Sequence, residues 1–178
     1  MKKDKKTILY ADQAVSFGGS IVVLGSLVGA LDKQSFRAIV AGEMSKSILD
    51  YHMQGNADIY VIPRLFKYTH WTKVTRVANR IHPLMFKKIF IYLMSGIKSL
   101  LNTVYIIRLI TIIFKEKVDL VHVNNGMSNL EPIIAAIVTG RKYVVHFHGV
   151  EKPGLIQCLL VNRVHKYIVL SRFLADAL

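Results

Sequence analysis

The sequence has little cysteine and lacks a segment that would direct the chain out of the cytoplasm. Its single cysteine, Cys158, excludes an intrachain disulfide and gives no sign of an oxidising compartment. The apolar stretch after the basic start MKKDKK runs only from Thr7 to Ala11, which is too short for the core of a signal peptide. The sequence contains no internal repeat or low-complexity linker. With 178 residues, 52% of them hydrophobic, we expect one cytoplasmic domain over residues 1–178.

Acidic residues are scarce and unevenly placed. The chain has 24 Lys and Arg against 11 Asp and Glu, which gives a formal net charge of +13. Between Ile59 and Lys115 the sequence has ten basic residues and no acidic one. The basic residues are Arg64, Lys67, Lys73, Arg76, Arg80, Lys87, Lys88, Lys98, Arg108 and Lys115. The basic segment 64–117 therefore predicts an anionic partner.

An anionic membrane surface is the partner that this segment favours. Phe66, Trp71 and Phe86 are interleaved with the cations, and aromatic side chains settle at headgroup depth while nearby cations are drawn to acidic lipids. We expect residues 64–92 to supply the contacts, with Lys67, Lys73, Arg76 and Arg80 in a loop-like region. The predicted membrane-contacting residues are Arg64, Lys67, Trp71, Lys73, Arg76, Arg80, Lys87 and Lys88. Nucleic acid is the alternative partner, although no RNA- or DNA-binding signature occurs.

The apolar run over residues 86–114 raises the question of a membrane span. A spanning helix needs about 20 mainly apolar residues, whereas Lys98 and Arg108 divide this run into pieces of about nine. Its polar positions recur at steps of three or four residues, which predicts an amphipathic pattern. For residues 99–117 a crossover helix packed on a sheet is the alternative to membrane contact.

Apolar runs alternate with helical patterns along the chain. The predicted strands are 7–11, 36–42, 57–63, 118–124, 142–148 and 166–171, and the predicted helices between them include 19–31, 44–54 and 129–138. Most of the strands are continuous runs of Val, Ile, Leu and Tyr, which is typical of strands covered on both faces. The alternation predicts an α/β fold with a doubly wound, parallel, Rossmann-like sheet.

Polar residues and glycines follow the predicted strands, at the edge where parallel sheets bind ligands. They are Asp12, Ser16, Gly18, Gly19 and Ser20; Asn124, Asn125 and Gly126; His146, His148, Gly149 and Glu151; and Ser171 and Arg172. We expect these residues to converge on one edge, although several orders of partners fit and no catalytic triad can be read from them. The adjacent glycines 18 and 19 would let a ligand approach the backbone closely, with a plain tight turn as the alternative.

Three stretches resemble, in chain order, the N-terminal half of a retaining GT-B glycosyltransferase of the large family four. They are FGGSIVVLGSLVGAL, VDLVHVNNGMSNLEPIIAAIVTGRKYVVHFHGVE and VHKYIVLSRFLADAL. Members of this family show a diglycine loop after the first strand, a D-hydrophobic-V-H strand, a V-V-x-x-x-H-G strand and a final strand that ends in a serine. Residues 64–114 carry no motif of the family.

The resemblance implies transfer of a sugar from a nucleotide-sugar, with retention, to a saccharide or lipid-linked acceptor at the cytoplasmic face of the membrane. It implies that the catalytic residue His148 lies beside the transferred sugar. The substrate-binding residues that it implies are Gly18, Gly19, Asn124, Asn125, Glu151 and Ser171. For Glu151 a solvated loop carboxylate is the alternative. His122 and His146 fall inside strands, and we expect them to pack.

The resemblance also implies a second, donor-binding domain, for which no sequence follows Leu178. We therefore expect a truncated chain that is inactive alone, with a split enzyme whose donor domain lies on another polypeptide as the alternative. No metal and no cofactor is implied, because the nucleotide-sugar is a co-substrate.

Two other classes of function compete with this interpretation. A dinucleotide-dependent oxidoreductase is favoured by Glu43, which ends the second strand where an acidic residue would hold a ribose. The glycines at 18, 19 and 25 do not make the G-x-G-x-x-G motif of that class. A zinc module could use His146 and His148, which share one face of a strand, but it lacks a third ligand.

Overall fold

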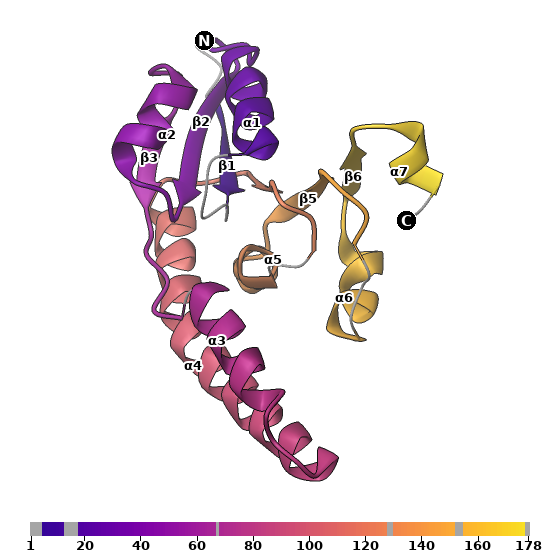
Figure 1. Ribbon diagram of the computed structural model, residues 1–178. Coiled ribbons are helices and arrows are strands. Elements are labelled where there is room, and N and C mark those ends of the chain that lie inside the picture. The colour runs from indigo at the N-terminus through magenta and orange to yellow at the C-terminus, as the bar shows by residue number, and fades with distance from the viewer. Residues whose placement is uncertain (1–4, 13–17, 67, 128–129, 152–154, 177–178) are drawn as a thin grey trace.

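A parallel sheet forms the centre of the protein in the computed structural model (Figure 1), which describes residues 5–12, 18–66, 68–127, 130–151 and 155–176. Among these residues the strands are β1 (Lys6–Asp12), β2 (Phe36–Gly42), β3 (Asp58–Val61), β4 (Leu120–Val123), β5 (Lys142–Phe147) and β6 (Lys166–Val169). They lie in the order β3-β2-β1-β4-β5-β6, and every pair is parallel. The predicted doubly wound α/β fold is therefore confirmed.

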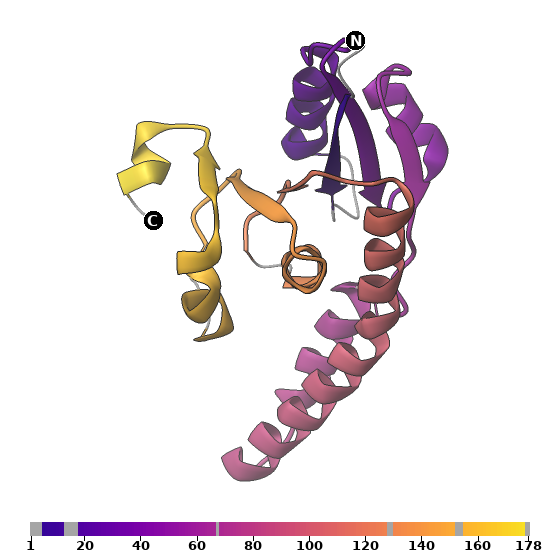
Figure 2. The same cartoon turned by 180° about the vertical axis from the view of Figure 1, so that it is seen from behind.

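The central strands are buried on both faces, as their continuous apolar runs predict. On one face, Leu9 and Ile39 are fully buried in a cluster with residues of α4 (Leu84–Lys115) and α5 (Leu130–Val138). On the other face, Tyr10 and Val40 pack with residues of α1 (Gly19–Gly29) and α2 (Lys46–Met53). Two apolar layers thus enclose the sheet, and Figure 2 shows the same arrangement from behind.

The remaining elements lie after β3 and in the C-terminal part of the chain. They are α3 (Tyr68–Ala78), α6 (Leu155–Leu160), the 3-10 helix η1 (Val161–Arg163) and α7 (Arg172–Asp176). The predicted loop-like region is wrong at Lys73 and Arg76, which belong to α3, whereas Arg80 lies in the turn after that helix. The predicted crossover helix over residues 99–117 is present, as the C-terminal half of α4.

Helix α4 is much longer than the strands that it crosses. Its 32 residues rise about 48 Å, whereas the seven residues of β2 extend about 23 Å. The C-terminal half packs on the sheet through Tyr105, Leu109 and Ile113, which are fully buried. The N-terminal half pairs with α3, and the two helices project past the carboxyl ends of β1 and β2 (Figure 1).

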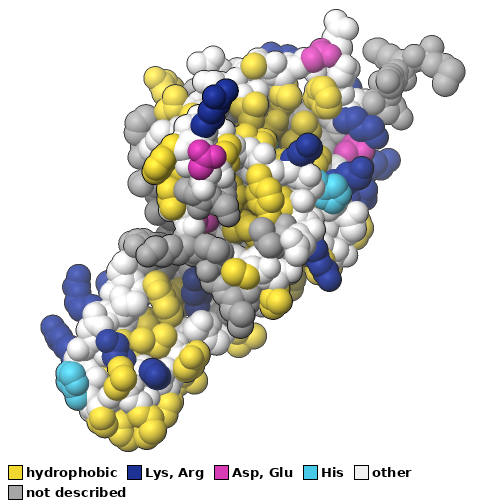
Figure 3. Space-filling view, turned by 90° about the vertical axis from the view of Figure 1, so that its right-hand side faces the viewer, with side chains coloured by type: hydrophobic (Ala, Val, Ile, Leu, Met, Phe, Trp, Pro, Cys, Tyr) yellow, Lys and Arg dark blue, Asp and Glu magenta, His cyan; other side chains and the backbone are white. Residues whose placement is uncertain are grey.

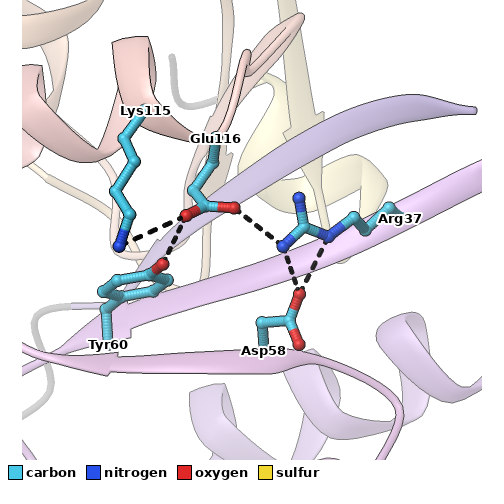
Figure 4. Close-up of polar contacts among 5 residues, drawn as sticks. All are labelled: Arg37, Asp58, Tyr60, Lys115 and Glu116. Atoms are coloured by element: carbon cyan, nitrogen blue, oxygen red, sulfur yellow. Dashed lines mark hydrogen bonds and ion pairs between the residues drawn. The ribbon is translucent and has the colours of Figure 1, made fainter.

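A polar network fixes the C-terminal end of α4 at the amino edge of the sheet (Figure 4). Glu116 accepts hydrogen bonds from Tyr60 Oη at 2.6 Å and from Arg37 Nη2 at 2.8 Å, and the same guanidinium pairs with Asp58 at 2.6 Å. The hydrogen bonds from Tyr60 and Arg37 lower the pKa of the Glu116 carboxyl. Because this end is held at the amino edge, the extra length of the helix emerges at the opposite, ligand-binding edge.

Candidate functional site

The carboxyl edge of the sheet gathers polar side chains from three strands, as the sequence predicts. Asp12 ends β1, Asn124 and Asn125 follow β4, and His148 follows β5. The Asn125 amide donates a hydrogen bond to Asp12 Oδ1, and His148 Nε2 lies 3.2 Å from Asn124 Oδ1. Parallel pairing brings these strand ends together although the residues are far apart in the sequence.

Asn124 is the centre of this arrangement. Its side chain is fully buried, and its Nδ2 donates to the carbonyl oxygen of Ser20 in the first turn of α1 at 3.3 Å. The same side chain therefore fixes the start of α1 and the ring of His148. Because an amide oxygen can only accept, His148 Nε2 carries the proton that this contact requires, which leaves Nδ1 as the acceptor of the neutral ring.

The two adjacent glycines lie at the N-terminus of α1. Gly18 is the residue before the helix, has φ −165° and ψ 176°, and offers no side-chain cap. This extended backbone is open to any residue, and a Cβ at Gly18 or Gly19 would meet no atom of the described residues within 4 Å. Neither the backbone conformation nor the packing of the described residues therefore explains the pair. Close approach of a ligand to the start of the helix stays a prediction.

Three histidine rings run from the interior of the sheet to this edge. The ring centroids of His122 and His146 are 5.5 Å apart, and those of His146 and His148 are 4.3 Å apart. Burial lowers the pKa of His122 to about 3 and that of His146 to about 4, so both rings are neutral near pH 7. Both are packing residues, as predicted. Burial also lowers the pKa of His148, so its ring binds a proton less readily than an exposed histidine.

Glu151 holds the loop that follows β4. Its carboxylate accepts a hydrogen bond from the backbone N–H of Met127 at 2.9 Å. The same carboxylate packs directly against Gly126, where the backbone has φ +64°. The alternative of a solvated loop carboxylate is therefore wrong, because Glu151 has a defined partner in this loop. Its predicted role in substrate binding stays a prediction.

Replacing Gly126 by alanine should lower the free energy of unfolding by more than the same change at Gly140. Both glycines have a positive φ, which costs an L-residue about 1–2 kcal/mol, but only at Gly126 would the new Cβ run into the Glu151 carboxylate. Urea unfolding of the variants Gly126→Ala and Gly140→Ala measures the difference. Equal losses at the two positions would show that Glu151 does not hold this loop.

Ser171 stands apart from the other predicted site residues. It is exposed at the end of β6, and its Oγ accepts a hydrogen bond from the Leu174 N–H at 3.3 Å, which caps α7. Within the described part of the chain no hydrogen bond joins it to Asn124 or His148. Ser16 and Lys67 lie outside the described residues. Among those that are described, no group of three His, Cys, Asp or Glu could hold a metal ion.

Sequence reasoning missed a buried ion-pair cluster beside the site. Arg64 Nε lies 2.9 Å from Glu43 Oε1, and Arg64 Nη2 lies 3.2 Å from Glu131 Oε2. Asn102 Nδ2 donates to Glu131 Oε1 at 2.9 Å, and the guanidinium stands 4.9 Å from the centre of the Tyr105 ring. The only signal in the sequence was the position of Glu43 and Glu131 beside strand and helix ends, which does not reveal a partner.

This cluster corrects two predictions. Arg64 was expected to contact a membrane, but its side chain is only 11% exposed and is engaged by two carboxylates. Glu43, the residue that favoured an oxidoreductase, is occupied by Arg64 rather than free to hold a ribose. Phe66, an aromatic residue expected beside the membrane, is also buried. Trp71 is partly buried and packs against Phe66 and Lys98.

The chain is similar to solved glycosyltransferase structures. HepE (Alr3699) of Anabaena, in complex with UDP and with UDP-glucose, superposes with a TM-score of 0.60 at 15% and 16% identity, over 96% of this chain and 39% of HepE. MurG of Acinetobacter baumannii gives 0.54 at 13% identity, over 93% of this chain and 41% of MurG. A glycosyltransferase of Rickettsia africae superposes with a TM-score of 0.54 at 16% identity, over 98% of this chain and 39% of that enzyme.

These structures are GT-B glycosyltransferases, and the present chain spans about two fifths of the length of each. The chain has the fold of the N-terminal half of a GT-B glycosyltransferase. No family model and no curated protein matches the sequence. The predicted fold is therefore confirmed, whereas membership of family four, retention and the roles of individual site residues stay predictions.

Proposed function

We propose that this chain is the acceptor-side domain of a glycosyltransferase that uses a nucleotide-sugar. One observation carries the proposal: almost the whole chain shares its fold with a structure that holds UDP-glucose. The acceptor is a saccharide or a lipid-linked saccharide, and the enzyme works peripherally at the cytoplasmic face of a membrane. Transfer requires a donor-binding domain, supplied by the same polypeptide or by another one, to complete the cleft.

The carboxyl edge of the sheet supplies the chemistry in this proposal. The N–H groups at the start of α1 favour negative charge, which suits the diphosphate of the donor. His148, oriented by Asn124, lies at the edge where the transferred sugar would sit and offers a neutral ring that accepts a hydrogen bond. The reaction, with retention, rests on electrostatic stabilisation of the departing diphosphate and of an oxocarbenium-like sugar.

Joining this chain to the donor-binding half of HepE tests the proposal. The hybrid should transfer radiolabelled sugar from UDP-glucose, whereas this chain alone should show no turnover. In the hybrid, His148→Ala and Gly19→Val should lower turnover by about one to two orders of magnitude, because the first removes a group beside the sugar and the second blocks approach to the helix start.

Gly29→Val, at the other end of α1, is the matched control and should keep turnover. There the new Cβ would meet only the Asn56 side chain, at an ordinary contact distance of 3.8 Å. Turnover by this chain alone would contradict the need for a donor domain. An active hybrid that tolerates both site substitutions would remove Gly19 and His148 from the proposed site.

A further inference from the structure

The helical pair that projects beyond the sheet carries an apolar end. We call α3 together with residues 84–100 of α4 the arm. Six of its large apolar side chains, each at least half exposed, are here named the apolar tip: Val77, Leu84, Met85, Phe86, Ile89 and Leu93. Figure 3 shows hydrophobic side chains gathered at the far end of the arm. Such a patch on a projecting element marks a surface that binds a partner.

Cations surround the apolar tip. The basic collar consists of Lys73 and Arg76 of α3, Arg80 in the turn that follows it, and Lys87 and Lys88 of α4. Figure 3 shows basic side chains along the flanks of the arm. The arm contains no Asp or Glu, and none of the ion pairs among the described residues involves a cation of the collar. We therefore expect a partner with a negatively charged surface and an apolar interior.

We propose that the arm enters an anionic bilayer by its end, with the apolar tip below the headgroups and the basic collar among the lipid phosphates. A second copy of the chain would bring two cationic arms together, which their like charges oppose. A nucleic acid would match the collar but leave the apolar tip in water. The lipid surface alone satisfies both parts of the arm.

The arm dips into the surface without crossing it. By length and composition α4 could span a bilayer, a property shared with core helices of soluble proteins. Its C-terminal half is such a core helix, because Tyr105, Leu109 and Ile113 are buried against the sheet. The free part, Leu84 to Leu100, rises about 25 Å and carries Lys87, Lys88 and Lys98.

The direction of the arm connects this surface to the candidate site. The arm and the carboxyl ends of β1 and β2 point the same way (Figure 1). A bilayer held at the tip therefore faces the edge that carries His148. This deepens the proposed function, since it selects a lipid-linked acceptor, but vesicle binding needs neither sugar nor donor and is tested without transfer.

Sedimentation with vesicles tests the inference on the chain as it is. The protein should bind vesicles of equal parts phosphatidylglycerol and phosphatidylcholine at least about tenfold more tightly than phosphatidylcholine alone. Raising the salt from about 0.1 M to 1 M should weaken binding at least about tenfold, because the screening length falls from about 10 Å to 3 Å. The triple variant Leu84→Ser, Met85→Ser, Phe86→Ser should bind the anionic vesicles about tenfold more weakly at low salt. Its circular dichroism spectrum should be unchanged, because these side chains are exposed.

Two variants with the same loss of charge distinguish the effect of the basic collar from the effect of the net charge of the chain. Changing Lys73, Arg76, Lys87 and Lys88 to Gln should reduce binding about tenfold or more. The control variant changes four exposed lysines elsewhere to Gln: Lys33, Lys46, Lys142 and Lys166. It removes the same charge and should reduce vesicle binding much less. Equal losses from the two sets would overturn the proposal.

A depth probe supplies the deciding measurement. In a Cys158→Ser background, a fluorophore at Phe86→Cys should be quenched by brominated lipid, and one at Lys46→Cys should not. No quenching at position 86, tighter binding to RNA than to vesicles, or self-association that the triple variant abolishes would each overturn the inference. Salt-insensitive binding to neutral vesicles would also overturn it, in favour of a spanning helix.

Discussion

Lowering the pH from 7 to 4.5 should reduce the free energy of unfolding by about 5 kcal/mol through two buried histidines. Burial lowers the pKa of His122 to about 3 and that of His146 to about 4, against about 6.5 in an unfolded chain. The unfolded chain therefore binds protons first as the pH falls. Stability from these rings is fully present above about pH 6.5 and is lost progressively toward their folded-state pKa values, at about 1.4 kcal/mol per pH unit for each ring.

Urea unfolding at the two pH values measures this loss. His122→Gln and His146→Gln should each remove about half of this loss of about 5 kcal/mol, because each deletes one of the two rings. Tyr10→Phe is the matched control: it keeps the ring that lies 4.9 Å from His122 and should keep the full dependence, since burial raises the pKa of Tyr10 to about 12. An unfolding free energy that stays constant from pH 7 to 4.5 would show that the histidines are not held neutral by burial.

Replacing Arg64 by methionine should lower the free energy of unfolding by about 3–5 kcal/mol at pH 7. The variant leaves the Glu43 and Glu131 carboxylates without their cation, and these side chains are only 6% and 12% exposed. Breaking a buried ion pair by removing one partner costs far more than losing an exposed pair, because the remaining charge stays desolvated. Urea unfolding is again the measurement.

Arg76→Met is the control for this experiment. Arg76 is exposed on α3, so the same change there should alter stability by no more than about 0.5 kcal/mol. The triple variant Arg64→Met, Glu43→Gln, Glu131→Gln should recover much of the loss, since it removes the stranded charges as well. A small effect of Arg64→Met would mean that water reaches the cluster and screens it.

The arm and the cluster are neighbours in the fold. Asn102 and Tyr105, which contact the Arg64 cluster, belong to α4 where that helix leaves the sheet for the arm. Arg64 itself precedes α3 in the chain. The cluster thus holds the root of the arm against the carboxyl edge of the sheet, and loss of Arg64 should loosen the element that we propose to carry the membrane contact.

The sequence alone determined the sheet and the edge at which its polar residues meet. The strand over residues 36–42 has the predicted bounds, because a run such as FRAIVAG is compatible with burial on both faces and with little else. Asn124, Asn125 and His148 were predicted to converge with Asp12 because parallel strands place their carboxyl ends together. Both inferences depend on local patterns and on one topological rule.

Only the tertiary structure decided which side chains of the basic segment are exposed and which are buried. Ten basic residues without an acidic one predicted a single exposed surface, yet the Arg64 side chain is buried against Glu43 and Glu131. These carboxylates come from other elements of the fold, so no local sequence pattern relates them to Arg64. The amphipathic pattern predicted around Lys98 and Arg108 lies on one continuous helix, and neither side chain is buried. Charge along a chain is a local property, whereas burial of a charge depends on what folds against it.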